Sequence, residues 1–368
     1  MKISAIKEKA QNEKRVAITP EAVKTYVKMG FEVCLEKGIG ESSNFFDAEY
    51  AEAGAKLSSV PMEILSDADI ILKVQFSPSE ESYSEKVFAK EGAIIIGLLN
   101  PYENQELVQY YKEKKINLLA MEFVPRTTKA QSFDALSSQS NLVGYRAVIE
   151  AANLYPKSIP MFMTAAGTIV PAKLLVLGAG VAGLQAIATA KRLGASVYAY
   201  DVRAAAKEQV ESLGAKFLYP EEKLDLSNNG IYAKETGTEF ASKQEEMLEK
   251  EISKFDIVIT TAMIPGKKAP ILITKNMVHK MKPGSVIVDA AASGGGNCEY
   301  TKLNEISEEN GVKILGWSNF ASNIAQDASK LYAKNLSNLI TYLSKNSVFL
   351  DESDEIVKSM LLTCRENA

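Results

Sequence analysis

The sequence predicts an α/β protein that contains two doubly wound parallel sheets. In the first and middle thirds of the chain, short apolar stretches alternate with amphipathic helical stretches, as in sheets whose parallel strands are linked by helices. A glycine-rich turn directly follows one of these apolar stretches. The length of 368 residues also favours two domains over one.

The first domain is expected to contain four buried strands, because each apolar stretch is short and is followed by a polar, helix-forming segment. These strands lie at residues 32–35, 70–74, 93–97 and 117–122, and helices are expected at residues 20–29 and 104–114.

The second domain repeats this alternation. Its strands are expected at residues 173–177, 196–200, 256–260, 285–289 and 313–315. A proline-containing break at residues 156–160 and two long helices, at 140–154 and 327–343, mark where the chain passes between the domains and returns. We therefore expect a discontinuous first domain of residues 1–138 and 328–368, a second domain of residues 139–327, and a cleft between them.

Composition and charge exclude several classes of protein. The chain has 46% hydrophobic and 24% charged residues and a formal net charge of -4, so it lacks the basic surface that nucleic acid requires. Its three cysteines, Cys34, Cys298 and Cys364, are too widely spaced for a structural metal site. This cysteine usage favours a reduced cytoplasmic protein. No run of 18 apolar residues is present, so we expect that the chain does not cross a membrane.

The glycine-rich turn has the spacing of a dinucleotide-binding site. Gly178, Gly180 and Gly183 follow an apolar strand and precede a helix, where glycines permit a tight turn, close approach of a pyrophosphate and close packing of helix on strand. Asp201 ends the next strand, where a carboxylate accepts hydrogen bonds from the ribose hydroxyls. Its charge favours NAD(H) over NADP(H), although Arg203 could weaken that preference. The pattern predicts a Rossmann-like domain.

A polar loop at residues 125–140 precedes the first linking helix. Arg126, Gln131, Asp134 and Ser137 supply the donors and acceptors that a nicotinamide carboxamide or a diphosphate needs. The same loop could simply cap the helix through Asp134 or a serine, and the composition alone does not separate these alternatives.

Three other stretches have less specific interpretations. Residues 220–239 show no period and are expected to form a mobile flap. The glycine run at residues 294–297 could admit a nucleotide or could be an ordinary loop. Residues 161–163 form a short apolar stretch that we expect to lie in the core.

Long segments of the chain resemble the NAD(H)-binding component of proton-translocating NAD(P) transhydrogenase, in the alanine dehydrogenase/transhydrogenase superfamily. The resemblance is clearest at residues 126–152 (RTTKAQSFDALSSQSNLVGYRAVIEAA), 163–195 (MTAAGTIVPAKLLVLGAGVAGLQAIATAKRLGA) and 280–291 (KMKPGSVIVDAA). It extends from Glu13 to Cys364, which is nearly the whole chain.

The resemblance implies roles for individual residues. Arg126, Asp134 and Ser137 would fix the carboxamide of NAD(H), Gln131 would reach toward NADP(H) held by a partner, and Tyr232 would belong to the loop that closes over the nucleotide. Further nucleotide contacts are implied at Val181, Asp201, Val202, Arg203, Gln244 and Met263. Two positions depart from the family pattern: Ile231 stands where glycine is common, and Met263 where leucine is usual.

The resemblance also implies the activity. Hydride would pass directly from NADH to NADP⁺ on a separate subunit, in a Re/Si-specific reaction that a membrane subunit couples to proton translocation. The chain would be active only with these partners. It would form a homodimer, peripheral on the inner face of the cytoplasmic membrane.

Two other functions are compatible with the sequence: an amino acid dehydrogenase such as alanine dehydrogenase, and a noncatalytic NAD(H) sensor. Oxidation of an amino acid requires a general acid/base. The places of the histidine and aspartate that serve alanine dehydrogenase hold Leu98 and Ser293. The only histidine, His279, precedes a strand and so lies at the wrong edge of the sheet. Arg15 and Lys73 could bind a carboxylate, but we interpret them as structural.

Overall fold

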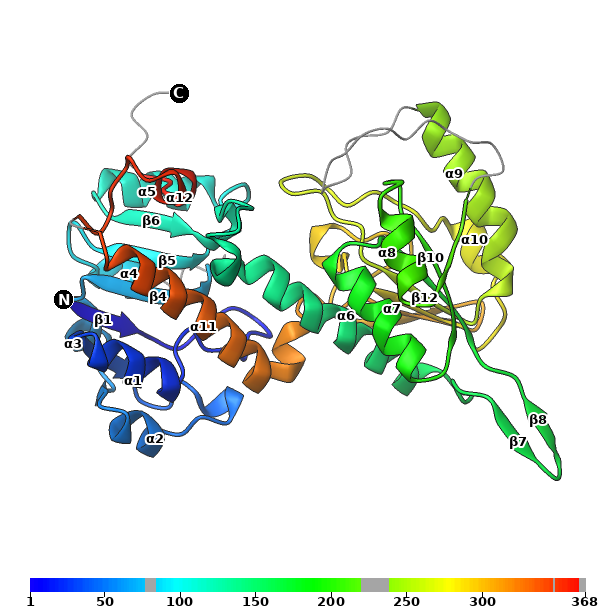
Figure 1. The fold of residues 1–368 in the computed structure, drawn as a ribbon, viewed down its shortest axis with the longest axis horizontal. Helices are drawn as coiled ribbons and strands as arrows, with labels where there is room; N and C mark the ends of the chain where they lie inside the picture. The colour runs from blue at the N-terminus through cyan, green and yellow to red at the C-terminus, as the bar shows by residue number, and fades with distance from the viewer. Residues whose placement is uncertain (77–83, 220–237, 347, 364–368) are drawn as a thin grey trace. The chain divides into compact units, whose positions relative to one another are not determined.

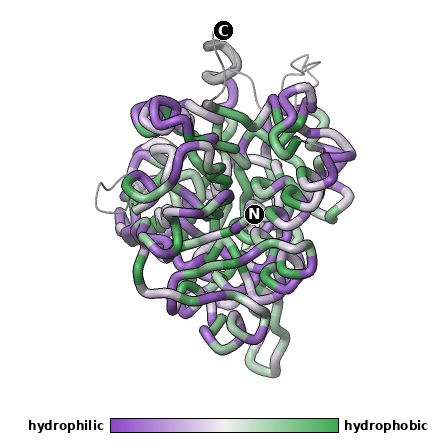
Figure 2. Tube along the Cα trace, turned by 90° about the vertical axis from the view of Figure 1, so that its left-hand side faces the viewer, coloured by the Kyte–Doolittle hydropathy of each residue, from purple (hydrophilic) through white to green (hydrophobic). Residues whose placement is uncertain are grey.

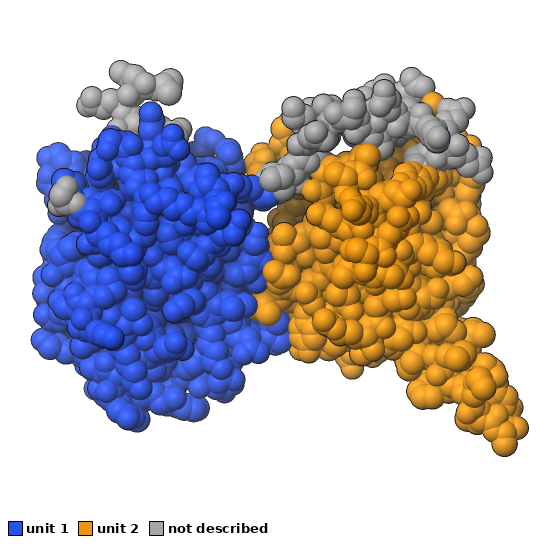
Figure 3. Space-filling model, in the orientation of Figure 1, with its two compact units in different colours: residues 1–139, 321–368 blue, residues 140–320 orange. Residues whose placement is uncertain are grey.

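The computed structural model describes residues 1–76, 84–219, 238–346 and 348–363. The chain folds into two compact units: unit 1 comprises residues 1–139 and 321–368, and unit 2 comprises residues 140–320 (Figure 3). Each is an α/β unit with its own sheet and hydrophobic core.

Unit 1 contains a six-stranded parallel sheet in the order β3-β2-β1-β4-β5-β6 (Figure 1). The strands are β1 Lys2–Ala5, β2 Glu32–Glu36, β3 Lys56–Ser58, β4 Ile70–Gln75, β5 Ile94–Leu98 and β6 Asn117–Ala120. The four predicted strands are confirmed, whereas β1 and β3 were not predicted. The strand order reverses direction at β1 and β4, so this pair marks the switch point at which doubly wound sheets bind ligands.

The central strands of unit 1 are mainly apolar because both faces of the sheet are covered. Successive residues of β4 alternate between two clusters: Ile70 and Leu72 pack on one side, and Ile71 packs on the other. Along the trace, hydrophobic segments, in green, alternate with hydrophilic segments, in purple (Figure 2). Buried parallel strands have this continuous apolar character because helices lie against both faces.

Helices cover the sheet of unit 1. They are α1 Pro20–Lys28, α2 Asp47–Glu52, α3 Pro61–Leu65, α4 Ser84–Phe88, α5 Gln105–Glu113, α11 Ala325–Leu343 and α12 Glu355–Met360. Helix α1 begins at a threonine cap followed by a proline, because Thr19 accepts a hydrogen bond from the Ala22 N–H and Pro20 needs no such partner. Helix α11, from the second segment of this unit, contributes Tyr332, Leu336 and other residues to the same core as α1.

Unit 2 contains a seven-stranded sheet in the order β11-β10-β9-β12-β13-β15-β14. All neighbouring strands are parallel except β14 and β15, which are antiparallel. The strands are β9 Lys173–Leu177, β10 Ser196–Tyr200, β11 Lys216–Phe217, β12 Ile257–Thr260, β13 Val286–Asp289, β14 Ile306–Glu309 and β15 Val312–Leu315. The five predicted strands are confirmed, and β11 and β14 are additional.

The helices of unit 2 are α7 Val181–Arg192, α8 Ala206–Ser212, α9 Thr238–Glu251 and α10 Lys275–Lys280. The linking helix α6, Ala135–Leu154, begins in unit 1 and continues into unit 2. Helices α6 and α7 cross at close range, since a Cβ atom added at Gly144 would lie 2.0 Å from the Ala182 carbonyl oxygen. Glycine at this crossing therefore determines how near α7 lies to α6.

A separate hairpin, β7 Phe162–Thr164 and β8 Gly167–Ile169, precedes β9. The expectation that residues 161–163 lie in the core is wrong, because Met161 is 56% exposed and Met163 is 74% exposed. Short apolar runs of this length are ambiguous in sequence, and here the run pairs only with its own return strand.

No described helix is both long enough and apolar enough to span a membrane.

Candidate functional site

The glycine turn of unit 2 lies between β9 and α7, where the order of the sheet reverses. Gly178 has a φ of +95°, a left-handed conformation that disfavours any side chain. A Cβ atom at Gly183 would lie 1.8 Å from the Gly178 carbonyl oxygen. These two glycines are therefore required by the fold of the turn itself.

Gly180 differs from the other two glycines. Its φ of −73° suits any residue, and a Cβ atom added there would meet no atom within 4 Å. The chain itself therefore gives no reason for glycine at this position. Gly180 is also the N-cap of α7, and no side chain caps this helix end. An open space before an uncapped helix N-terminus fits a pyrophosphate, because the first N–H groups and the helix dipole both favour an anion.

Asp201 follows β10 and is held beside the glycine turn. Its carboxylate accepts a hydrogen bond of 2.7 Å from the Ala179 N–H, and the residue is buried. The Arg203 backbone N–H (2.8 Å) and Nε (2.9 Å) donate to the same carboxylate. The hydrogen bond with Asp201, despite opposing burial, raises the pKa of Arg203. Arg203 is thus oriented by Asp201, and the two charges offset each other.

The remaining nucleotide positions predicted in unit 2 have different exposures. Val181 and Met263 are exposed, Val202 is half-buried, and Gln244 on α9 is buried. The Tyr200 hydroxyl lies 3.5 Å from Oε1 of Gln244, at the limit of a hydrogen bond. The structure therefore places Gln244 beside the end of β10. The side chains of Val181 and Met263 are apolar, and they would contact a nucleotide only by packing.

Most of the predicted flap at residues 220–239 lies outside the described residues. This includes Tyr232 and Ile231. The last two positions of the segment, Thr238 and Glu239, begin helix α9.

A buried aspartate shapes the loop that follows β13, and the sequence did not single it out. Asp289 is fully buried and accepts five hydrogen bonds, including those from Thr260 (2.9 Å), the Asn297 N–H (2.7 Å) and Thr301 (2.6 Å). A Cβ atom at Gly296 would lie 2.8 Å from its Oδ2 atom. Close approach to Asp289 thus explains the glycine at position 296.

The predicted loop at residues 125–140 contains a short 3₁₀ helix, η4, Gln131–Phe133, and its last residues, from Ala135, form the start of α6. The Asp134 carboxylate accepts hydrogen bonds from the Ser137 N–H (2.9 Å) and the Ser137 hydroxyl (2.5 Å). Asp134 is therefore the N-cap of α6, as one of the two sequence interpretations expected. The cap ties Asp134 and Ser137 together, and the other predicted residues of this loop, Arg126 and Gln131, are exposed.

Charged groups gather beyond the carboxyl ends of β1 and β4. The Arg15 guanidinium donates to both carboxylate oxygens of Glu13, at 2.8 Å and 2.6 Å, and its Nη1 donates to Gln139 at 2.8 Å. Lys73 forms a buried ion pair with Glu85. The chain's own carboxylates thus neutralise both cations, which supports the structural interpretation of Arg15 and Lys73.

Glu8 belongs to this charged group. Its Oε1 atom accepts a 2.6 Å hydrogen bond from the Val74 N–H. Burial raises the pKa of Glu8 to about 7, although the nearby Lys73 acts in the opposite direction. Glu8 therefore exchanges a proton near neutral pH, unlike an exposed carboxyl group.

The residues at the alanine dehydrogenase positions carry no acid/base group. Leu98 is the last residue of β5, and Ser293 is exposed in a short 3₁₀ helix after β13. His279 is exposed on α10, before β13 begins, and its Nε2 lies 3.1 Å from the Tyr300 hydroxyl. No group of three or more potential metal ligands occurs among the residues that the structure describes.

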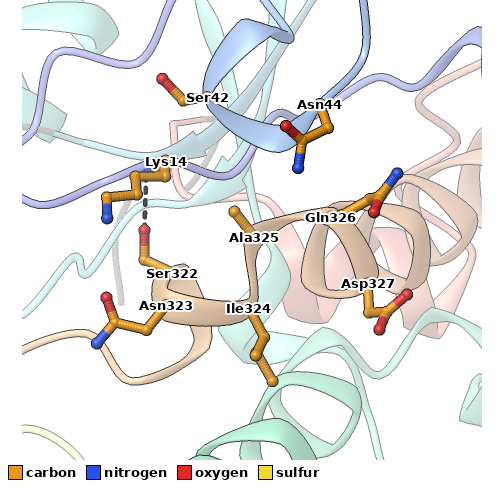
Figure 4. A pocket seen from close by; sticks show the side chains of 9 residues that line it. All are labelled: Lys14, Ser42, Asn44, Ser322, Asn323, Ile324, Ala325, Gln326 and Asp327. Atoms are coloured by element: carbon orange, nitrogen blue, oxygen red, sulfur yellow. Dashed lines mark hydrogen bonds between the residues drawn. The ribbon is translucent and has the colours of Figure 1, made fainter.

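A polar cavity of about 360 Å³ lies in unit 1 at the start of α11 (Figure 4). The Lys14 N–H donates to the Ser322 hydroxyl at 2.6 Å within it. Its other lining residues are Ser42, Asn44, Asn323, Ile324, Ala325, Gln326 and Asp327. None of the residues predicted from the sequence lines this cavity.

The class of protein follows from unit 2. A doubly wound parallel sheet, a three-glycine turn at its switch point and an acidic residue after the next strand define a dinucleotide-binding domain. Residues 4–143 match the family described as Alanine dehydrogenase/PNT, N-terminal domain, and residues 147–368 match its C-terminal domain. The chain belongs to this family.

Its relatives indicate which members of this family the chain resembles. The chain is 57% identical over 363 residues to the first part of the NAD(P) transhydrogenase alpha subunit of Rickettsia prowazekii, covering 99% of this chain and 94% of the relative. It is 50% identical over 369 residues to the protein of that name from Rhodospirillum rubrum, covering 99% and 96%. Its fold matches the crystal structure of transhydrogenase from Sinorhizobium meliloti with a TM-score of 0.88 and 45% identity, covering 99% and 98%.

Proposed function

We propose that this chain is the NAD(H)-binding subunit of a proton-translocating NAD(P) transhydrogenase. In the proposed reaction, bound NADH supplies a hydride to NADP⁺ that a separate subunit holds. One observation supports the binding step above all: Gly180 leaves an open space before the uncapped end of α7, beside Asp201. The resemblance to transhydrogenase alpha subunits supports the reaction.

The residues of unit 2 would hold the dinucleotide in a defined order. The turn at Gly178, Gly180 and Gly183 would receive the pyrophosphate, and Asp201 would accept hydrogen bonds from a ribose. A 2′-phosphate would face the Asp201 carboxylate, which favours NAD(H). Further contacts are proposed at Val181, Val202, Arg203, Gln244 and Met263.

The loop of unit 1 would position the reacting ring. Arg126, Asp134 and Ser137 are proposed to fix the carboxamide, and Tyr232 to contribute from the flap. Gln131 is exposed, so its amide is available to a partner-bound NADP(H). The Asp134 N–H donates to the Gln131 carbonyl oxygen at 3.3 Å, and the Asp134 side chain caps the long helix α6.

Transfer of hydride between two nicotinamide rings needs no general base, because no proton leaves or enters at the reacting carbons. Such a step depends on holding donor and acceptor about 3–3.5 Å apart. Leu98, in place of a catalytic histidine, therefore fits transhydrogenation and disfavours amino acid oxidation.

The proposal requires partners. The relatives are named as subunits, which supports an assembly of several chains. We infer an NADP(H)-binding subunit, a membrane subunit that carries the protons, and a homodimer of this chain, peripheral on the cytoplasmic face of the membrane.

The test combines the purified chain with an NADP(H)-binding subunit of a transhydrogenase. We expect hydride transfer from NADH to thio-NADP⁺, followed by absorbance, and no NAD⁺ reduction when the chain alone receives alanine. Turnover of alanine would instead support the amino acid dehydrogenase. Binding of NADH without hydride transfer to any partner would support the NAD(H) sensor.

A variant tests the role of Gln131. Gln131→Asn should bind NADH normally, in a fluorescence titration, yet transfer hydride more slowly because its shortened amide reaches less far. Gln109→Asn makes the same change at an exposed position of α5 and should behave like the unmodified chain. Loss of NADH affinity with unchanged transfer would contradict the assigned role.

A further inference from the structure

The loop that carries Gln131 and Asp134 rests on helix α11, and the side chain of Asn335 makes two of its hydrogen bonds there. Asn335 of α11 is 8% exposed. Its Nδ2 donates to the Ser132 carbonyl oxygen at 2.9 Å, and its Oδ1 accepts from the Ser138 hydroxyl at 2.7 Å. Both ends of this amide are therefore engaged.

The two partners of Asn335 lie on either side of Asp134. Ser132 is in η4, directly after Gln131, and Ser138 is in the first turn of α6. A single buried amide thus joins the backbone of η4 to a side chain of α6, on the two sides of the cap. Opposite ends of the turn cannot move apart without breaking one of these hydrogen bonds.

Other contacts complete this attachment. The Phe133 side chain is buried in the same core as α11, and its ring centroid lies 5.4 Å from that of Tyr342. Asn338, one turn after Asn335, is half-buried and also donates to the Ser132 carbonyl, at 3.2 Å, through an exposed hydrogen bond. Hydrogen bonds of a buried side chain hold geometry more strongly than those of a more exposed one, because water replaces a lost partner less readily.

We propose that Asn335 is a positioning residue for hydride transfer. Its amide fixes the backbone of residues 132–138 and so places Gln131 and Asp134, without touching either nucleotide. This inference rests on the proposed function. Small displacements of a positioning loop can reduce a transfer rate by about a hundredfold while ground-state binding persists.

The test uses Asn335→Asp and Asn335→Ala, with Asn338→Asp and Asn338→Ala as matched controls on the same helix. In the chain alone, amide hydrogen exchange across residues 130–138 should accelerate in the Asn335 variants and change much less in the controls. With the NADP(H)-binding subunit, the Asn335 variants should transfer hydride about ten- to a hundredfold more slowly at pH 8, with NADH affinity unchanged.

The pH profile of Asn335→Asp separates positioning from general destabilisation. A protonated Asp offers an O–H donor to the Ser132 carbonyl and an acceptor to Ser138, as the amide does, whereas its carboxylate offers only acceptors. Burial at this position raises the pKa of the introduced Asp above that of an exposed carboxyl group. The transfer rate of Asn335→Asp relative to that of the unmodified chain should therefore rise as the pH falls from 8 to 6. The relative rate of Asn335→Ala should not rise.

Several outcomes would overturn the proposal. One is that amide hydrogen exchange and hydride transfer are both unchanged in the two Asn335 variants. Another is that a variant loses NADH affinity but transfers hydride at the normal rate per bound NADH. If a variant fails to fold, Ser138→Ala removes one of the two hydrogen bonds from outside α11 and should slow transfer in the same direction. Absence of transfer by the unmodified chain would refute the proposed function, and the exchange experiment would still decide whether Asn335 holds the loop.

Discussion

Gly180 and Gly183 allow the nucleotide site to be tested separately from the fold. Both belong to the same turn, but the chain itself requires only Gly183. A Cβ atom at Gly183 would lie 1.8 Å from the Gly178 carbonyl oxygen, whereas ordinary contact begins at 3.4 Å, so backbone must shift by about 1.6 Å. At Gly180 the added atom meets nothing within 4 Å.

Gly183→Ala should therefore destabilise the fold, whereas Gly180→Ala should weaken the binding of NADH. Gly183→Ala should lower the melting temperature by about 2–4 °C per kcal/mol, because overpacking lowers the free energy of unfolding by about 1–3 kcal/mol. Gly180→Ala should leave it unchanged or raise it by about 0.4–1 kcal/mol, since alanine restricts the unfolded chain. If its methyl group removes one charge-assisted hydrogen bond to the pyrophosphate, worth about 1.5–3 kcal/mol, NADH affinity should fall about 10- to 150-fold.

Thermal unfolding and NADH fluorescence titration measure these two quantities. Gly180→Ala should keep its melting temperature and lose affinity. If it binds NADH as tightly as the unmodified chain, the pyrophosphate does not lie at this turn, and the argument from the open space is refuted.

Three further predictions concern charged groups. Glu85→Gln should lower the free energy of unfolding by about 3–5 kcal/mol, because it leaves Lys73 buried without its carboxylate. In denaturant titration, the double variant Lys73→Met, Glu85→Leu should recover much of this loss. A single variant as stable as the unmodified chain would contradict the buried ion pair. Because burial raises the pKa of Glu8 from 4.5 to about 7, the stability that Glu8 contributes is fully present below pH 4.5 and is lost as the pH rises through 7. The free energy of unfolding of Glu8→Gln should therefore fall less between pH 5 and 8 than that of the unmodified chain, and identical pH profiles would argue against the raised pKa. Asp201→Asn should weaken NADH binding about tenfold and raise the relative affinity for NADPH, in parallel fluorescence titrations; an unchanged NADH to NADPH ratio would remove Asp201 from the site.

Strands were predictable where burial on both faces gave them a run of at least three consecutive apolar residues. The segments at β4, β5, β9, β12 and β13 meet this condition. Strand β1 was missed although it is central, because Lys2 and Ser4 interrupt its apolar pattern. The structure gives these polar groups partners: Lys2 pairs with Asp67, and Ser4 donates to the Ile64 carbonyl at 2.7 Å.

The candidate site was predictable only to a limited extent. Gly178, Gly180 and Gly183 and Asp201 lie close together in the sequence, and local rules for a strand, a turn and a helix connect them. Asn335 and Asp289 carried no such local pattern. Their partners lie on other elements, at Ser132 and Thr260 for example, so only folding brings these groups together.

The sequence by itself determined the alternation of strands and helices, the dinucleotide turn and the acidic residue after it, because each depends on residues within one turn or one strand–helix pair. Only the tertiary structure decided which glycine leaves open space before helix α7 and which carboxylates neutralise Arg15 and Lys73. It also decided which side chain holds the loop that carries Gln131. Those properties depend on distances between segments far apart in the chain, and no local periodicity encodes them.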